Sequence, residues 1–222
     1  MAYEHDVFVS YKWGNDLKIW VDKVFIPILK DALYDTTDSA EDSIIFHDAE
    51  ENKPGGSIPL VLRDGVARSK CMVCVITYPY FTKSAWCPAE LSAMLEREKV
   101  TAIRQPPKHV GLVFPVLFVD MSKTRLADRN PVYGLPGPKN FLTKIQPLEL
   151  DEDKFFRISA GFKDTNGFDD LRLLVKKWVR ESIKDRLKKT PSWNKEWAND
   201  HYFNSKFNAP VSQTVRFALP KL

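Results

Sequence analysis

Three mainly apolar runs constrain the fold of this chain more than any other feature of its sequence. They lie at residues 7–11, 72–77 and 110–119. A strand that is apolar on both sides belongs inside a parallel sheet with helices on both faces, whereas a strand with one solvated face alternates apolar and polar residues. Stretches with helical spacing separate the three runs. The pattern therefore predicts a layered α/β fold.

Further strands and helices are expected between and after these runs. The strands are expected at 43–47 and 145–150, and the helices at about 17–29, 60–67, 84–98 and 168–187. Pro27 is expected to kink the first helix or to end it early, because proline lacks the N–H that an interior helical position donates. Residues 48–57 and 123–140 are expected to form long loops. The predicted architecture is a flavodoxin-like three-layer α/β sandwich around a central parallel sheet of about five strands.

The expected domain boundary follows the last clear helix. Residues 1–187 form one predicted domain, and residues 188–222 form an extension of unknown role. The extension contains the aromatic residues Trp193, Trp197, Tyr202, Phe203 and Phe207. Disordered segments are poor in aromatic residues, so the extension is expected either to pack back onto the domain or to join a partner interface.

The mild net charge of the chain gives no reason to expect nucleic acid or a membrane as a partner. The net charge is +4 over 222 residues, and charges of both signs are interleaved. Such a balance requires neither nucleic acid nor an anionic membrane as a partner.

The first residues lack the basic and apolar regions of a signal peptide, and no apolar run is long enough to cross a bilayer. A cytoplasmic protein is expected.

The cysteines are expected to be structural. Cys71 and Cys74 form a C-x-x-C pair, a spacing found in redox and zinc sites. They lie in an apolar run that reads as a strand, where an offset of three residues sends the two sulfur atoms to opposite faces. The sequence has no second cysteine pair, and its four histidines are scattered. We expect buried thiols, no metal site and no cofactor.

Candidate ligand-binding residues follow the expected strands. In an open parallel sheet, ligands bind at the carboxyl ends of the strands. Ser10, Tyr11, Lys12 and Trp13 lie at the end of the first strand and offer a hydroxyl group, two aromatic faces and a cation. The alternatives are that Trp13 is a packing residue and that Lys12 is a solvated charge. Tyr80 lies in a loop expected at residues 78–84, after the third strand, and either stacks on a ligand ring or seals the edge of the core.

The 48–57 loop is the second candidate segment. It begins with Asp48 and contains the turn Pro54-Gly55-Gly56. Gly55 and Gly56 allow the backbone to approach a ligand closely, and they precede a helix whose N-terminal N–H groups attract phosphate. A plain turn is the alternative, since this composition is common in turns.

The segment Ser84-Ala85-Trp86-Cys87-Pro88-Ala89-Glu90-Leu91 carries the strongest motif. Trp86 and Glu90 are four residues apart and share one face of the expected helix. A carboxylate early in a helix is also favoured by the helix dipole without any function. Together with Asp6-Val7-Phe8-Val9-Ser10-Tyr11, the segment resembles the TIR (Toll/interleukin-1 receptor) domain family.

The resemblance implies specific roles for these residues. In the family, the S-x-W-C-x-x-E-L segment opens the third helix, and in the enzymatic members its glutamate is the catalytic residue for cleaving NAD⁺. The resemblance therefore implies that Glu90 is catalytic and that Ser10, Tyr11, Lys12, Trp13, Asp48, Gly55, Gly56, Tyr80 and Trp86 bind substrate. The 48–57 loop matches the BB loop, through which TIR domains also self-associate.

The resemblance is closest to stand-alone bacterial TIR proteins, several of which act in defence against phage. It implies an NAD⁺ glycohydrolase or ADP-ribosyl cyclase that uses NAD⁺ as substrate and releases ADP-ribose or a cyclic isomer. Non-enzymatic TIR domains carry the same motif, so a scaffold that acts through TIR–TIR contacts is the alternative. A response regulator of similar fold fits less well, because its third strand would end in Asp, whereas this one ends Ile76-Thr77.

Overall fold

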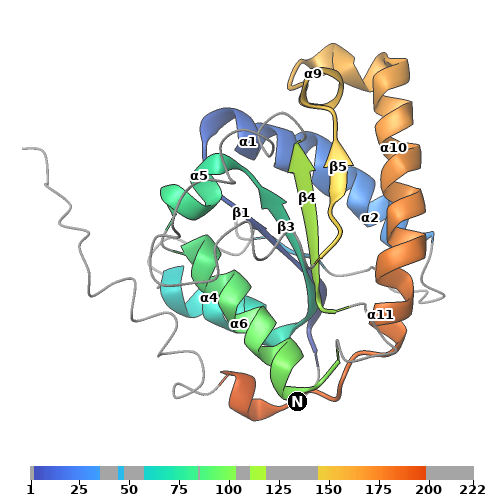
Figure 1. Ribbon diagram of the computed structural model, residues 1–222. Helices are drawn as coiled ribbons and strands as arrows, with labels where there is room; N and C mark the ends of the chain where they lie inside the picture. The colour runs from blue at the N-terminus through green and yellow to red at the C-terminus, as the bar shows by residue number, and fades with distance from the viewer. Residues whose placement is uncertain are drawn as a thin grey trace, which may run out of the picture.

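A parallel sheet of five strands forms the centre of the protein (Figure 1). The computed structural model describes residues 3–35, 45–47, 58–84, 86–103, 111–118 and 145–198. The strands are β1 (His5–Tyr11), β2 (Ile45–Phe46), β3 (Ser69–Ile76), β4 (Val113–Phe118) and β5 (Leu148–Leu150), and their spatial order is β2-β1-β3-β4-β5. Every pair of neighbours is parallel. This order is that of a flavodoxin-like sheet and confirms the predicted fold class.

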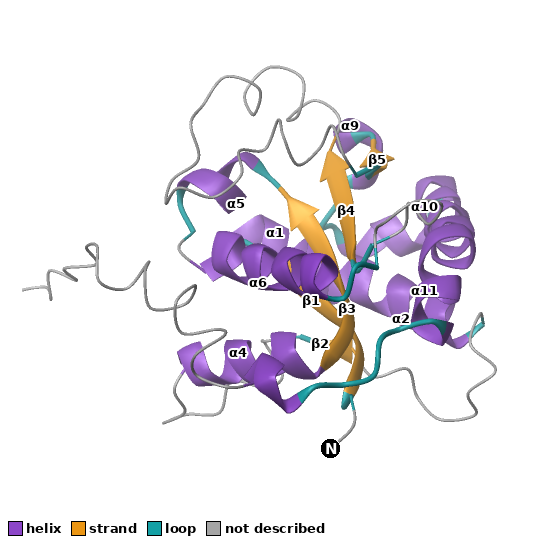
Figure 2. Cartoon of the chain, turned by 60° about the horizontal axis from the view of Figure 1, so that its bottom comes forward, coloured by secondary structure: helices purple, strands orange, loops and turns teal. Residues whose placement is uncertain are grey.

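Helices cover both faces of the sheet, as Figure 2 shows for α2, α10 and α11 on one side and α4 and α6 on the other. The first layer contains α1 (Asn15–Trp20), the π-helical turn η1 (Val21–Phe25), α2 (Ile26–Tyr34), α10 (Asn166–Trp178), the π-helical turn η4 (Val179–Ile183) and α11 (Lys184–Lys188). The second contains α4 (Ile58–Arg68), α5 (Tyr78–Thr82) and α6 (Trp86–Val100). Short helical segments α9 (Glu152–Phe155), η3 (Ala160–Asp164) and η5 (Lys195–Ala198) complete the described elements.

Alternation along β3 divides the core into two clusters. Cys71 and Val73 pack in the cluster under α2 and α10, whereas Met72 and Cys74 pack in the cluster under α4 and α6. The two thiols thus lie on opposite faces of the sheet, as the strand pattern predicted. Cys71, Cys74 and Cys87 are all buried and free.

The first helix does not end at Pro27. It continues to Tyr34, and the turn before the proline is π-helical, with the Ile26 N–H donating to the Val21 carbonyl five residues earlier. A proline ring collides with the carbonyl of the residue four positions before it. A widened turn directly before Pro27 accommodates the ring while the helix goes on.

Two other elements depart from the sequence-based expectation. β3 begins at Ser69, before the apolar run, because Ser69 pairs with His5 of β1. Residues 78–82, expected in a loop, form α5, whose first turn contains Pro79, a position where a missing N–H costs nothing. The expected 48–57 and 123–140 loops lie outside the described residues.

The described part of the C-terminal extension packs onto the α4 and α6 layer. The Tyr3 hydroxyl donates to the Pro191 carbonyl at 2.7 Å, and Trp197 is 3% exposed. The Arg97 guanidinium lies 4.6 Å from the centre of the Trp197 ring. Residues 191–198 therefore pack back onto the domain. The boundary at residue 187 stays a prediction, and residues 199–222 lie outside the described part of the chain.

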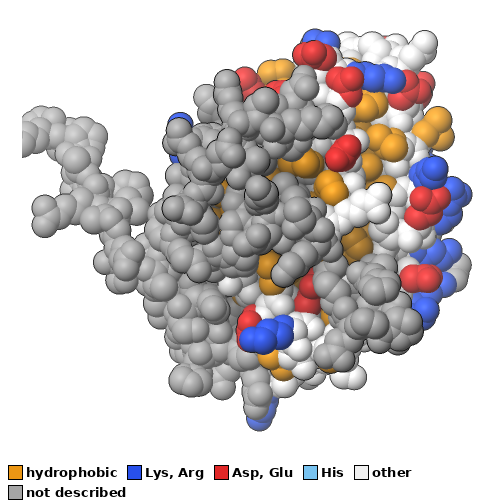
Figure 3. All heavy atoms as spheres, viewed as in Figure 1, with side chains coloured by type: hydrophobic (Ala, Val, Ile, Leu, Met, Phe, Trp, Pro, Cys, Tyr) orange, Lys and Arg blue, Asp and Glu red, His pale blue; other side chains and the backbone are white. Residues whose placement is uncertain are grey.

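The described surface mixes charges of both signs (Figure 3). On the α2 and α10 side, Lys176 pairs with Asp35 at 2.5 Å and Arg172 pairs with Asp31 at 3.6 Å. Over the described ranges, no helix is long and apolar enough to span a bilayer.

Candidate functional site

A small pocket lies at the topological switch point of the sheet, between the neighbouring strands β1 and β3. β1 and β3 are neighbours, but the helix after β1 covers one face of the sheet and the helices after β3 cover the other. Their connections diverge and leave a crevice at the carboxyl ends of the two strands. In Figure 1 these ends lie near α1 and α5. A pocket of about 180 Å³ occupies this position and is lined by Tyr11, Lys12, Trp13, Leu62, Ser84, Trp86, Cys87 and Glu90.

Glu90 lies at the buried side of this pocket and is held by Ser10. The Ser10 hydroxyl donates to Glu90 Oε2 at 2.6 Å, although the two residues are 80 positions apart in the sequence. Glu90 is 4% exposed and Ser10 is 2% exposed. A short hydrogen bond to a charged acceptor is among the stronger ones in proteins, so it fixes the orientation of the carboxylate.

Tyr80 completes the support of Glu90. Its hydroxyl lies 2.8 Å from Ser10 Oγ and 3.2 Å from the Cys87 carbonyl. Burial raises the pKa of Tyr80 well above its ordinary value, and the Glu90 carboxylate raises it further, whereas the hydrogen bond with Ser10 opposes the shift; the hydroxyl therefore keeps its proton. Because Ser10 gives its only proton to Glu90, it accepts from Tyr80, whose one proton is shared between Ser10 Oγ and the Cys87 carbonyl. Tyr80, Ser10 and Glu90 thus form a chain of donors that ends on the carboxylate.

The two thiols near Glu90, those of Cys87 and Cys74, remain neutral. Burial raises the pKa of Cys87 well above the ordinary thiol value, and the Glu90 carboxylate raises it further. Burial likewise raises the pKa of Cys74, and the Tyr80 hydroxyl opposes this shift. A nucleophilic or metal-binding thiolate is therefore disfavoured at this site.

Ser10 and Tyr80 are placed behind the pocket instead of along its wall. Tyr80 is fully buried and neither residue lines the pocket, so neither presents a surface on which a ligand ring can stack. α5 turns the Tyr80 ring inward, where its centroid lies 5.0 Å from that of Phe81. The alternative reading of Tyr80, that it seals the core, describes its position.

Trp86 and Glu90 reach the pocket together because α6 begins at Trp86. Ser84 precedes the helix, and its hydroxyl accepts the Cys87 N–H at 3.1 Å. This is the bond of an N-terminal cap, and it explains the serine of the motif without a ligand. Trp13, which is 45% exposed, stands at the outer rim of the same pocket.

Leu62, Ser84 and Cys87 line the pocket but were not predicted as site residues. Ser84 and Cys87 belong to the same motif as Trp86, so the sequence could have indicated that they line the pocket. Nothing in the sequence indicates this for Leu62, because its spacing within α4 is that of an ordinary core residue.

The remaining predicted site residues, Asp48, Gly55 and Gly56, lie outside the described residues. Within the part of the chain that is described, no group of three or more His, Cys, Asp or Glu side chains is arranged to hold a metal ion.

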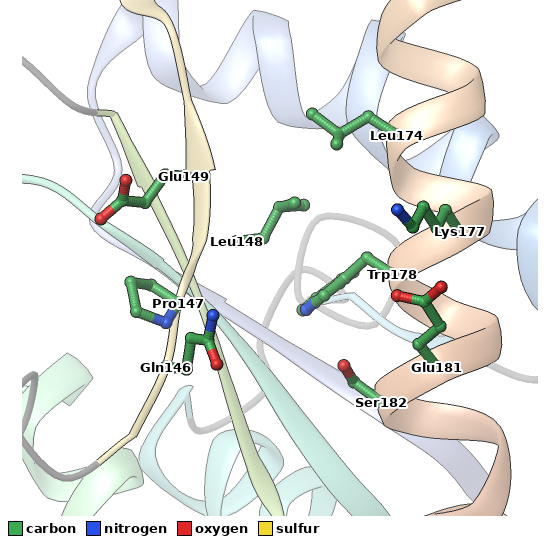
Figure 4. Close-up of a pocket in the computed structure, with 9 residues that line it drawn as sticks. All are labelled: Gln146, Pro147, Leu148, Glu149, Leu174, Lys177, Trp178, Glu181 and Ser182. Carbon is green, nitrogen blue, oxygen red and sulfur yellow. The ribbon is translucent and has the colours of Figure 1, made fainter.

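A second, larger hollow of about 340 Å³ lies between β5 and α10 (Figure 4). Leu148 of β5 points toward Trp178 and Leu174 of α10 across it, whereas the Glu149 side chain points away from α10. It contains none of the residues that the sequence motifs predict. We therefore place the candidate active site at the smaller pocket around Glu90.

Comparison with known proteins identifies the family of the chain. A family model described as TIR domain matches residues 7–133, more than half of the chain. Among solved structures, the chain is similar to "Structure of the activated Roq1 resistosome directly recognizing the pathogen effector XopQ (TIR domains)", with 18% identity, a TM-score of 0.38, and coverage of 94% of this chain and 98% of that chain. No curated protein matches the sequence. The matched residues contain β1 from Val7 onward, the whole of α6 and the whole of the pocket lining. The chain belongs to the TIR domain family.

Proposed function

We propose that this TIR domain cleaves the bond between nicotinamide and ribose in NAD⁺, with Glu90 as the catalytic residue. The observation that carries the proposal is a nearly buried carboxylate, oriented by Ser10 and placed in a pocket at the switch point of the sheet. A desolvated and oriented carboxylate stabilises positive charge far better than a solvated one.

The proposed chemistry needs little besides this carboxylate. When the C–N bond breaks, its electron pair goes to the nicotinamide ring, which leaves as a neutral molecule without a general acid. The ribose carbon acquires oxocarbenium character, as in glycoside cleavage, and Glu90 stabilises it. Water then adds to this carbon and loses a proton, giving ADP-ribose. If a hydroxyl group or ring nitrogen of the same molecule adds first, the product is a cyclic isomer.

The other lining residues fit parts of the same substrate. Trp86 lies one helical turn before Glu90 and offers an apolar wall that excludes water from the reacting bond. Tyr11 and Trp13 offer aromatic faces, and Lys12 offers a cation for the pyrophosphate. We propose NAD⁺ as the substrate and no additional cofactor.

The size of the pocket supports a role for self-association. Pockets that enclose a drug-sized ligand measure about 300–1,000 Å³. The pocket around Glu90, at about 180 Å³, accommodates one end of a dinucleotide. We propose that a second copy of the chain completes the site through the 48–57 loop, so that activity rises with assembly.

A non-catalytic scaffold is the alternative function, and the same small pocket volume favours it. The proposed biological setting, a bacterial response to phage, is supported by the resemblance to stand-alone bacterial TIR proteins. Phage challenge of cells that express wild-type protein or Glu90→Gln tests that setting.

Nicotinamide release from NAD⁺ separates the two functions. The wild-type chain is measured over a range of protein concentrations, beside Glu90→Gln and Glu96→Gln. Glu96 lies on the same helix but is partly exposed and paired with Lys99, so it is a matched control. We expect release by wild type and Glu96→Gln and at least a hundredfold loss in Glu90→Gln. Equal nicotinamide release by wild type and both variants would refute the proposal that Glu90 is catalytic. No release from an assembled wild-type protein would refute the proposed enzymatic function.

A further inference from the structure

A second polar cluster adjoins the pocket without lining it. Its centre is Asp22, which belongs to the π-helical turn η1. Asp22 Oδ1 lies 2.8 Å from His47 Nε2 and 3.4 Å from the Tyr11 hydroxyl, and Oδ2 lies 2.5 Å from Lys18 Nζ. Three elements that are separate in the sequence, namely β1, the end of β2 and the first helix, thus meet at one carboxylate.

The donor and acceptor groups of these side chains determine which of them donates in each hydrogen bond to Asp22. A carboxylate only accepts, so His47 Nε2 carries a proton and donates to Asp22. The Tyr11 hydroxyl also donates to Asp22, and His47 Nε2 lies 3.4 Å from the same hydroxyl oxygen. The Tyr11 and His47 rings are nearly parallel, with 14° between their planes and 6.0 Å between their centroids. Asp22 therefore collects donors from three side chains and holds two rings in register.

The cluster reaches the pocket at two points. Tyr11 lines the pocket directly. Lys18, held by Asp22, lies 5.7 Å from the centre of the Trp13 ring, within the range of a cation–π contact, and Trp13 forms the exposed rim. The two aromatic side chains that the first strand and its loop contribute to the pocket, Tyr11 and Trp13, are thus tied to one aspartate that is not itself a lining residue.

The helical backbone at Asp22 departs from regular α-helix geometry. Single π-helical turns are rare, and they occur often next to functional sites because they change the direction of one side chain. Here the turn lies directly before Pro27 and includes Asp22. Pro27 accounts for the widened turn, and the turn sets the position of Asp22 on the helix.

We propose that Asp22 is a positioning residue for substrate binding, acting through Tyr11 and through the Lys18–Trp13 contact. It fixes the two aromatic walls that receive the rings of the substrate, while Ser10 and Tyr80 fix Glu90. This inference rests on the proposed NAD⁺-cleaving function. Loss of Asp22 weakens binding of NAD⁺ and leaves the chemical step intact, because the support of Glu90 involves none of the same residues.

The test compares Asp22→Ala and Lys18→Met with wild type and with Asp31→Ala. Asp31 lies on the same helical run but pairs with Arg172 of α10, away from the pocket, and is a matched control. Nicotinamide release is measured at a protein concentration where activity per molecule no longer rises. We expect KM to rise about tenfold in Asp22→Ala, with kcat within about twofold of wild type, since a hydrogen-bonded charge that orders a binding wall is lost. Lys18→Met is expected to raise KM less, and Asp31→Ala not at all.

A second readout does not depend on catalysis. The indole N–H signal of Trp13, assigned with Trp13→Phe, reports the mobility of the rim through its ¹⁵N relaxation. We expect this indole to become more mobile in Asp22→Ala and Lys18→Met but not in Asp31→Ala. An unchanged indole, a fall in kcat at constant KM, or the same effect in Asp31→Ala overturns the inference. If wild type releases no nicotinamide, the proposed function fails, and a mobile Trp13 in Asp22→Ala still supports the positioning of the rim.

Discussion

Ser10 Oγ lies 2.6 Å from Glu90 Oε2, and this bond joins the end of β1 to the second turn of α6. Both groups are almost completely buried. A carboxylate in such a place is costly unless donors compensate for lost water. The Ser10 hydroxyl is one such donor, and Tyr80 orients it. The orientation of the candidate catalytic residue is therefore set by side chains that are not in contact with the pocket.

Ser10→Ala is expected to lower kcat without changing KM. The substitution removes one donor from Glu90, and a hydrogen bond to a charged group contributes about 1.5–3 kcal/mol, which corresponds to a loss of about 10- to 150-fold. Steady-state nicotinamide release checks this, with thermal unfolding to verify that the variant is folded. Raised KM at unchanged kcat would instead place Ser10 on the substrate.

Tyr80→Phe distinguishes support of Glu90 from stacking on a ligand. The ring stays and only the hydroxyl is lost, so a stacking residue would keep its activity. We expect kcat to fall about tenfold, because the Ser10 hydroxyl loses its donor and the buried Cys87 carbonyl loses a partner. If Tyr80→Phe keeps the kcat of wild type, Ser10 orients Glu90 without the hydrogen bond from Tyr80.

The central strands, and the position of Glu90 beside Trp86, were predictable from the sequence, because local patterns encode both. Apolar runs place β1, β3 and β4 in the middle of the sheet, and the spacing of Trp86 and Glu90 places them on one helical face. The flavodoxin-like order follows from the family resemblance together with these runs.

The roles of individual polar residues were less predictable, because they depend on contacts between distant positions. Nothing within reach of Ser10 in the sequence indicates that its partner is 80 residues away. Tyr80 was a candidate for ring stacking while its segment was taken for a loop, but the segment forms α5 and the Tyr80 ring is buried. Asp22 and His47 have no local motif at all, and only the fold brings them together.

Trp197→Ala is expected to destabilise the whole domain. Trp197 is buried against Arg97 and belongs to the core cluster beneath α4 and α6. Truncating a buried tryptophan costs about 3–5 kcal/mol, which for a domain of this size lowers Tm by about 6–15 °C. Differential scanning calorimetry measures the change, with the exposed Lys195→Ala as the control. A Tm within about 2 °C of wild type would mean that the extension is dispensable for stability.

Stability is expected to fall above about pH 8.5. Burial raises the pKa of Cys71, Cys74 and Cys87 in the folded state, whereas an unfolded thiol has a pKa of about 8.5. Below that pH both states keep their protons and the full stability is present. As the pH rises further, only the unfolded chain releases protons, so each thiol costs about 1.4 kcal/mol one unit above its unfolded pKa.

Thermal unfolding between pH 7.5 and 10 measures this loss. The decline in Tm is expected to be less steep in Cys74→Ala, which removes one of the three buried thiols, when each variant is compared with its own value at pH 7.5. Because Tyr80 is also held neutral by burial, the loss should continue beyond pH 10, where an unfolded tyrosine ionises. A Tm that stays constant to pH 10 would show that the thiols ionise equally well in the folded protein.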